Sequence, residues 1–255
     1  MKIKASLILV LLAGSVFTFT GCKKSSTNPS GPALTPKQVT SQLALNLNAV
    51  LYDGFGAFNL NGGLGAPGNL GLINTHGLKL NDIGDPLCGT MADTTLNYSV
   101  SENGVQASVK GNIKISFICA SGILSGFNIT DNLAVGESSS DYSLAVKLIE
   151  DLTLAAQNPQ NDNSNLTLNG TFTYDGTYNY KSGNSTQNFS YTFNSIVLDS
   201  SGEILSGSAT FATNGNGKNG VWNYSGSIKF LGGGNATVTI NGAVYNVNIE
   251  TGSVS

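Results

Sequence analysis

The feature that most constrains the fold is an alternation of apolar and polar residues through much of residues 93–255. Successive side chains of a β-strand point to opposite faces, so an alternating run gathers its apolar residues on one face. Three runs show this pattern clearly. Their predicted apolar faces are Ile113, Ile115, Phe117 and Cys119; Phe189, Tyr191, Phe193 and Val197; and Trp222, Tyr224, Ile228 and Phe230. The pattern predicts strands with one buried and one solvated face.

Short turn signals separate the alternating runs. They lie at residues 102–104, 175–176, 182–184, 200–203, 214–217, 232–235 and 241–242. Asn-Gly and Asp-Gly pairs favour two-residue hairpin turns, because both central residues of a type I′ turn need a positive φ. We therefore predict an antiparallel meander of about 9–11 strands. The segment Tyr142–Ala156 fits both the strand and the helix period, and we favour the strand.

A meander with one apolar face must hide that face from water. Closing into a barrel, curling into a half-barrel or folding into a sandwich would each do so, and the sequence leaves all three open. The predicted fold class is thus mostly β, with one N-terminal amphipathic helix that could plug an open side. This order of elements is similar to the half-barrel of the lipoprotein carriers and receptors of the Lol pathway. The likeness is one of architecture, and no residue carries it.

The helix is predicted over residues 36–51. Thr35 is a favourable N-cap, Pro36 suits the first helical position, and Gln38 completes a capping box. Leu34 and Val39 are placed to form a hydrophobic staple. Apolar residues then recur at helical spacing and form one stripe, which we expect to pack on the sheet. The members of the stripe are Val39, Leu43, Leu47, Val50 and Leu51.

Residues 54–86 are rich in glycine, which recurs every two to four residues. That spacing argues against a long regular element. Leu, Ile and Phe also recur, so the segment is expected to be ordered against the core, with short strands near residues 70–74 and 78–80. A lid over the mouth of a cavity is an alternative interpretation.

The chain begins with a cationic tip, Lys2 and Lys4, and an apolar run that ends at Cys22. The run is short and ends in a processing pattern, which indicates a secretory signal rather than a transmembrane helix. Residues 19–22, Phe-Thr-Gly-Cys, resemble the lipobox of bacterial lipoprotein precursors, although Phe19 stands where that family usually has Leu. The resemblance implies removal of residues 1–21 and acylation of Cys22, which anchors the protein to a membrane.

The residues after the lipobox, CKKSSTNPSGP, resemble the start of uncharacterised envelope lipoproteins of the Bacteroidota. Lys23 is not the aspartate that retains some lipoproteins at the inner membrane, so the resemblance implies the outer membrane. Surface-export signals of that group are acidic, whereas this segment is basic, so we expect the protein to face the periplasm. We thus predict a signal peptide at 1–21, a flexible tether at 22–33 and a single β-rich domain at 34–255.

Cys88 and Cys119 are the two cysteines that remain. An even pair in an oxidising compartment favours a disulfide, and two unpaired buried thiols are the alternative. A catalytic cysteine is disfavoured, because neither residue has a histidine near it in the sequence.

The composition argues against several functions. Net charge is −3 and no basic patch occurs, so nucleic acid is not an expected partner. His76 is the single histidine, which excludes a metal site built on imidazoles, and we assign it no catalytic role. Residues around Asp162 could loosely hold Ca²⁺, but a solvated hairpin tip is the simpler interpretation. The carboxylates are scattered, and the adjacent Glu150 and Asp151 should point to opposite sides of a strand.

Aromatic residues are the remaining candidates for a binding site, as pocket or glycan contacts, although aromatics on a strand face usually belong to the core. They are Tyr174, Tyr178, Tyr180, Tyr191, Trp222 and Tyr224. We expect a non-enzymatic envelope lipoprotein without metal or cofactor that binds an apolar or lipid-like ligand. The alternative is a structural lipoprotein that contacts envelope proteins or glycans, and a hydrolase is a third hypothesis.

Overall fold

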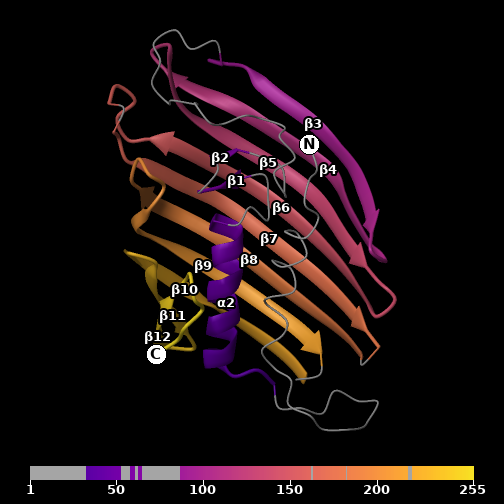
Figure 1. The fold of residues 1–255 in the computed structure, drawn as a ribbon. Coiled ribbons are helices and arrows are strands. Elements are labelled where there is room, and N and C mark those ends of the chain that lie inside the picture. Colours follow the sequence, from indigo (N-terminus) through magenta and orange to yellow (C-terminus); the bar gives the residue numbers. More distant parts are fainter. Residues whose placement is uncertain are drawn as a thin grey trace.

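The computed structural model describes residues 33–52, 58–60, 63–64, 87–161, 163–181, 183–217 and 220–255. The protein is mostly β: ten antiparallel strands form one meander sheet, and one described helix precedes it (Figure 1). The helix is α2, Pro36–Leu51. The sheet consists of β3 Met91–Glu102, β4 Val105–Ala120, β5 Ile123–Ser138, β6 Tyr142–Ala156, β7 Leu166–Tyr180, β8 Gly183–Leu198, β9 Ile204–Gly217, β10 Gly220–Gly232, β11 Asn235–Ile240 and β12 Ala243–Asn248.

The order of strands across the sheet is their order along the chain, from β3 at one edge to β12 at the other. The two edge strands do not pair with each other, so the sheet stays open. Of the three predicted ways to hide the apolar face, neither a closed barrel nor a two-sheet sandwich forms. The sheet is twisted and bends around α2, which lies on one of its faces (Figure 1).

Several predictions fall on residues outside those that the structure describes. They are the signal peptide at 1–21, the proposed lipid attachment at Cys22, the tether at 22–33, and His76 and Asp162. Of the tether, only residue 33 is described. The glycine-rich segment is described at residues 58–60 and 63–64, where β1 Phe58–Asn59 pairs with β2 Gly63–Leu64. The short strands predicted at 70–74 and 78–80 lie outside the described residues.

The predicted helix is confirmed with its bounds. The Thr35 side chain accepts a hydrogen bond from the Gln38 backbone N–H at 3.4 Å, and Gln38 Oε1 accepts one from the Thr35 N–H at 2.9 Å. This is the predicted capping box. Leu34 and Val39, the predicted staple, are both buried and form a small cluster with Trp222 of β10.

The predicted alternation is confirmed in most strands. Tyr142–Ala156 is strand β6, as favoured, and its burial alternates along its length. Phe117 and Ile113 share the buried face of β4, and Ile228 and Phe230 share that of β10. In the alternating stretches, the buried side chains lie on the side of the sheet on which α2 packs, which we call the inner face.

The prediction for Val197 is wrong, because a bulge near the end of β8 reverses the alternation. Ser195 has φ +49°, and the register with β9 shifts between Asn194 and Val197. The extra residue turns Ile196 and Leu198 inward, where both are fully buried, and leaves Val197 half-buried.

Two turn predictions are also wrong, because their glycines lie within strands. Gly176 is inside β7, where a Cβ atom would lie 2.8 Å from the Tyr174 ring. Gly215 is inside β9, where a Cβ atom would lie 2.0 Å from the Trp222 ring. Each glycine leaves room for an aromatic ring to lie flat on the inner face. By contrast, Asn241 and Gly242 have the positive φ values of the predicted hairpin turn.

We predict that Gly215→Ala destabilises the protein by about 1–3 kcal/mol, because the new methyl group displaces the Trp222 ring. The change should also shift the emission of Trp222, the only tryptophan. Gly136→Ala is the matched control, since its Cβ would meet the Ser108 hydroxyl at 3.0 Å and the Leu144 carbonyl at 4.0 Å, and no aromatic ring. Urea unfolding followed by fluorescence gives both readouts, and equal midpoints for the two variants would contradict the packing described.

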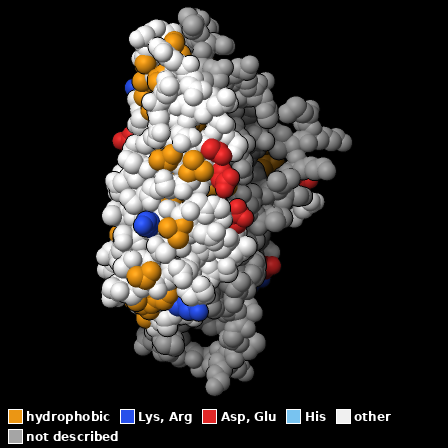
Figure 2. Space-filling model, turned by 90° about the vertical axis from the view of Figure 1, so that its left-hand side faces the viewer, with side chains coloured by type: hydrophobic (Ala, Val, Ile, Leu, Met, Phe, Trp, Pro, Cys, Tyr) orange, Lys and Arg blue, Asp and Glu red, His pale blue; other side chains and the backbone are white. Residues whose placement is uncertain are grey.

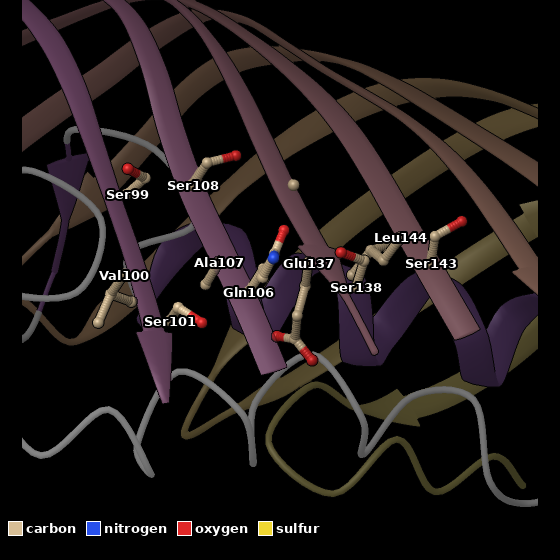
Figure 3. A pocket seen from close by; sticks show the side chains of 11 residues that line it. Ser99, Val100, Ser101, Gln106, Ala107, Ser108, Glu137, Ser138, Ser143 and Leu144 are labelled. Atoms are coloured by element: carbon tan, nitrogen blue, oxygen red, sulfur yellow. The ribbon is translucent and has the colours of Figure 1, made fainter. Parts of the chain in front are cut away.

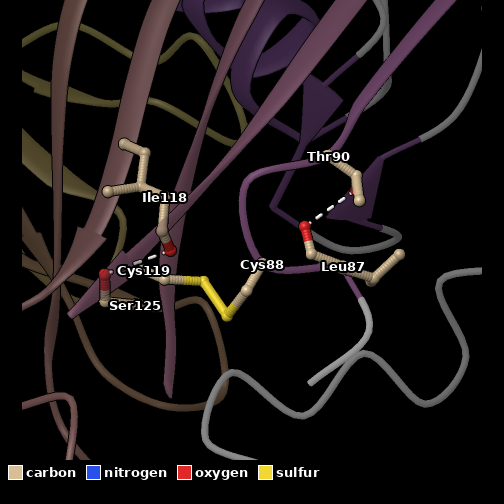
Figure 4. Close-up of a disulfide and its surroundings, with 6 residues drawn as sticks. All are labelled: Leu87, Cys88, Thr90, Ile118, Cys119 and Ser125. Carbon is tan, nitrogen blue, oxygen red and sulfur yellow. Dashed lines mark hydrogen bonds between the residues drawn. A yellow bond between two sulfur atoms is a disulfide. The ribbon is translucent and has the colours of Figure 1, made fainter. Parts of the chain in front are cut away.

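The predicted disulfide is present between Cys88 and Cys119, with their Cα atoms 5.6 Å apart (Figure 4). Cys88 lies in a turn just before β3, where Thr90 Oγ1 donates to the Leu87 carbonyl at 2.8 Å. Cys119 lies near the end of β4, at a shift in register with β5. The bond therefore fixes the start of the edge strand β3 to β4, the strand that pairs with it among the described residues.

We predict that the double variant Cys88→Ala/Cys119→Ala loses about 3–4 kcal/mol of unfolding free energy, the chain-entropy value for a loop of this length. The sequence separation is 31 residues. The check is equilibrium unfolding of the oxidised wild type and the variant. A variant with unchanged stability would mean that the bond does not restrict the unfolded chain.

Candidate ligand-binding face

The inner face has an aromatic cluster at its centre, on β7 and β8. Phe189 and Tyr191 are stacked with ring centres 6.2 Å apart, and Tyr191 and Phe193 are stacked at 5.9 Å. From β7, Phe172 lies 6.4 Å from Tyr191 and Tyr174 lies 6.2 Å from Phe189. All five side chains are buried, so the cluster belongs to the core.

Polar residues of α2 form hydrogen bonds with side chains of β8, in and beside this cluster. The Tyr191 hydroxyl donates to Asn46 Oδ1 at 2.8 Å, and both side chains are buried. Gln187 Nε2 donates to Gln42 Oε1 at 3.0 Å. Burial raises the pKa of Tyr191 well above its usual value, so the hydroxyl stays protonated as a donor. These bonds fix the helix over β8.

The helix covers only part of the inner face. The helix also contacts β12. The Ser41 hydroxyl donates a hydrogen bond to the Gly252 carbonyl. Just before the helix, the Leu34 carbonyl accepts one from the Tyr224 hydroxyl of β10 at 2.8 Å. Thus α2 lies over β8–β12 (Figure 1). No described helix lies over the inner face of β4–β6, which is almost wholly apolar. Its buried members are Val109, Ile113, Ile115, Phe117, Phe127, Ile129, Leu133, Leu144, Val146, Leu148, Leu152 and Leu154.

Two carboxylates interrupt this apolar surface. Asp131 of β5 and Glu150 of β6 are register partners, and they are 5% and 1% exposed. Asp131 Oδ1 accepts a hydrogen bond from the Glu150 backbone N–H at 3.1 Å. Ile113 and Phe172 flank the pair in the same cross-strand row. Burying carboxylates is costly, so this pair is the least core-like feature of the inner face.

A second polar group lies at the end of the inner face nearest the β5–β6 turn. Glu137 is 6% exposed and its Oε1 accepts a hydrogen bond from the Tyr142 hydroxyl. Burial, together with this bond, raises the pKa of Tyr142 to about 12. The hydroxyls of Tyr174 and Tyr178 also hydrogen-bond to each other, and burial raises the pKa of both. These phenols therefore act as neutral donors at physiological pH.

The outer face of the sheet has a different chemistry, because hydroxyl and amide side chains lie in cross-strand rows. One row crosses seven strands: Thr130, Asp151, Thr171, Thr192, Thr210, Ser227 and Thr239. A second row contains Asp175, Asn188, Asn214 and Asn223. On the side shown in Figure 2, the described apolar side chains form small separate groups, and several acidic side chains lie next to one another near the middle of the view.

A cavity of about 590 Å³ lies at the ends of β3–β6 nearest the β3–β4 and β5–β6 turns (Figure 3). Most of its lining side chains carry hydroxyl or amide groups. The lining residues are Ser99, Val100, Ser101, Gln106, Ala107, Ser108, Gly136, Glu137, Ser138, Ser143 and Leu144. The cavity therefore suits polar rather than apolar contacts.

The structure places the aromatic candidates in the core or at its margin. Tyr174, Tyr178, Tyr191 and Trp222 are buried, and Tyr180 and Tyr224 are partly buried. Glu150 and Asp151 point to opposite faces, as predicted. The sequence reasoning missed the pairing of Asp131 with Glu150. The sequence feature that could have indicated it is Asp131, an acidic residue at an inward position of an alternating run, between Ile129 and Leu133.

Within the described residues, no three His, Cys, Asp or Glu side chains gather as metal ligands. In the same part of the chain, no helix has the length and apolarity to cross a bilayer.

Comparison with protein-family models, with curated proteins and with solved structures finds no match to this chain. A functional assignment therefore depends on the geometry described above and on the sequence.

Proposed function

We propose that the protein is a non-enzymatic, lipid-anchored lipoprotein of the bacterial envelope that binds an apolar or lipid-like ligand. The ligand would contact the inner face of β4–β6, beside α2. The proposed anchor is Cys22, in the outer membrane and facing the periplasm, and no cofactor is involved.

The observation that carries the proposal is the extended apolar surface on the inner face of β4–β6, beside the docked helix. Its apolar side chains named above are no more than 9% exposed, so the proposed ligand would reach them where the residues that bury them separate. Apolar area that leaves water contributes about 25 cal/mol per Å². An apolar surface of this kind can hold an acyl chain or a ring system. Val135 and Ala107, toward the end of this surface nearest the β3–β4 and β5–β6 turns, are only half-buried.

The anchor is supported by the sequence alone. A single acyl chain gives only marginal, reversible binding to a bilayer, so stable anchoring takes two or more chains. A lipobox cysteine carries that number in the family that residues 19–22 resemble. The tether at 22–33 would then hold the domain away from the bilayer.

A second candidate function is a surface-interaction lipoprotein that contacts glycans or envelope proteins. The outer face favours it, because neighbouring hydroxyl and amide side chains within each row are spaced by the ~4.8 Å between strands, and the rows carry few charges. The hydroxyl-lined cavity near the β3 edge supports the same reading (Figure 3). Such a surface suits a neutral, hydroxyl-rich polymer better than an ionic partner.

The test is titration with a fluorescent fatty acid, parinaric acid, using a soluble form that lacks Cys22. Val135→Trp fills the lower inner face and should weaken binding at least tenfold. Ala134→Trp is the matched control, because Ala134 is the neighbouring residue on the exposed outer face and should leave binding unchanged. Circular dichroism checks that both variants fold.

Native mass spectrometry of the protein purified from its envelope gives an independent readout. A co-purifying lipid supports the proposal. Absence of both a bound lipid and parinaric acid binding would contradict it. Crosslinking in cells to an envelope protein or glycan, with no bound lipid, would favour the second candidate.

A further inference from the structure

The two edges of the open sheet differ. The β12 edge is covered by the C-terminal residues of the chain, which form a bridge between Val247 and Val254. Asn246 and Ser255 exchange two backbone hydrogen bonds, both of 2.9–3.1 Å, and the Asn248 N–H donates to the Ser253 carbonyl at 3.0 Å. The second half of this edge, Asn246–Asn248, is therefore already paired.

The β3 edge has no such cover among the described residues. β3 pairs with β4 through twelve consecutive residues without a bulge, from Met91 to Glu102. On its other side no described strand pairs with it. The disulfide fixes the start of this strand, so the edge is preformed rather than frayed.

Half of the backbone groups of β3 point away from β4. Asn103 and Gly104, with φ +52° and +78°, form a two-residue turn, so the flanking Glu102 and Val105 are a hydrogen-bonded pair. Every second residue back from Glu102 is likewise bonded to β4. The alternate residues direct their N–H and C=O groups outward: Met91, Asp93, Thr95, Asn97, Ser99 and Ser101.

Within the described residues, this edge lacks the usual protection against pairing. Natural sheets guard their edges with lysine, proline, bulges or very short strands. β3 is 12 residues long, contains neither lysine nor proline, and carries charge only at Asp93 and Glu102 near its ends. Tyr98 is 37% exposed and Met91 is 58% exposed. An unprotected edge of this length favours addition of a strand.

We propose that the β3 edge pairs with the β3 edge of a second copy of this chain, in an antiparallel, two-fold symmetric dimer. A second copy brings an edge that has the same outward groups and is equally uncovered. Residues whose backbone groups point outward must pair with residues of the same kind in the second copy. This pairing also keeps the two inner faces on the same side of the joint sheet.

One register best fits the side chains, with Asn97 opposite Asn97 of the second copy. Leu96 then lies opposite Tyr98 on the inner face, twice, and such aliphatic–aromatic cross-strand pairs stabilise sheets. Asp93 lies opposite Ser101 and Glu102 opposite Ala92, so no two carboxylates face each other. Anchoring of both copies in one membrane would raise their effective concentration, a contribution that rests on the proposed lipid anchor.

Cysteine substitution tests the register in a soluble form that lacks Cys22. In the proposed dimer, the two Cα atoms at residue 97 are about 5.5 Å apart, a separation that a disulfide spans. We expect Asn97→Cys to give a covalent dimer under a mild oxidant such as diamide. Thr95→Cys is the matched control: it lies on the same face of the same strand, but its two copies are about 14 Å apart. It should crosslink at least tenfold more slowly.

Asn97→Pro tests the strand pairing without a crosslink. Proline removes an outward N–H and leaves the ladder to β4 intact, so the monomer should fold. Sedimentation of the wild type should show a concentration-dependent dimer. We expect Asn97→Pro to abolish this dimer and Asn97→Ala, which keeps the N–H, to retain it. A wild type that is monomeric at all concentrations, or equal crosslinking of the residue 95 and residue 97 variants, would overturn the proposal. Ligand binding on the inner face is measured separately and could fail without affecting this result.

Discussion

The structure depends on the docking of α2 against the aromatic inner face of β8 and β10. An open sheet with one apolar face is unstable in water unless another element covers that face. Here the apolar stripe of α2 covers the part of that face formed by β8–β12, with Leu43 and Leu47 essentially inaccessible to water. The Tyr191–Asn46 hydrogen bond gives the docking a defined position, because either group would be costly to bury alone.

The position of the helix also determines which surfaces remain for function. Because α2 is placed over β8–β12, the inner face of β4–β6 is the apolar region with no described helix above it, and this supports the proposed ligand site. The meander leaves two edges, and the C-terminal residues cover the one beside α2. The β3 edge, on the far side of the sheet, is the one from which we infer dimerisation. The first proposal thus follows from the position of the helix, and the second from the different cover of the two edges.

Local patterns in the sequence predict much of this fold. The capping box at Thr35 and Gln38 is a short-range interaction, so it marks the helix start without tertiary information. Strand alternation likewise predicts the buried faces of β4 and β10. The errors occur where tertiary packing changes local preference. Gly215 suggests a turn but lies in a strand beneath Trp222, and the bulge at Ser195 reverses the positions that follow it. The pairing of Asp131 with Glu150 depends on strand register, which the sequence did not specify.

The central claim, that α2 holds the open sheet together, is tested most directly by unfolding of a Leu47→Asp variant. A charge in place of this buried side chain should lower the unfolding free energy by about 3 kcal/mol or more. Ala49→Asp, at a half-exposed position of the same helix, should cost far less. The account predicts that Leu47→Asp alone loses the strand signal in circular dichroism at a much lower urea concentration. Equal midpoints for Leu47→Asp and the wild type would show that the sheet is stable without the helix, and would contradict the account.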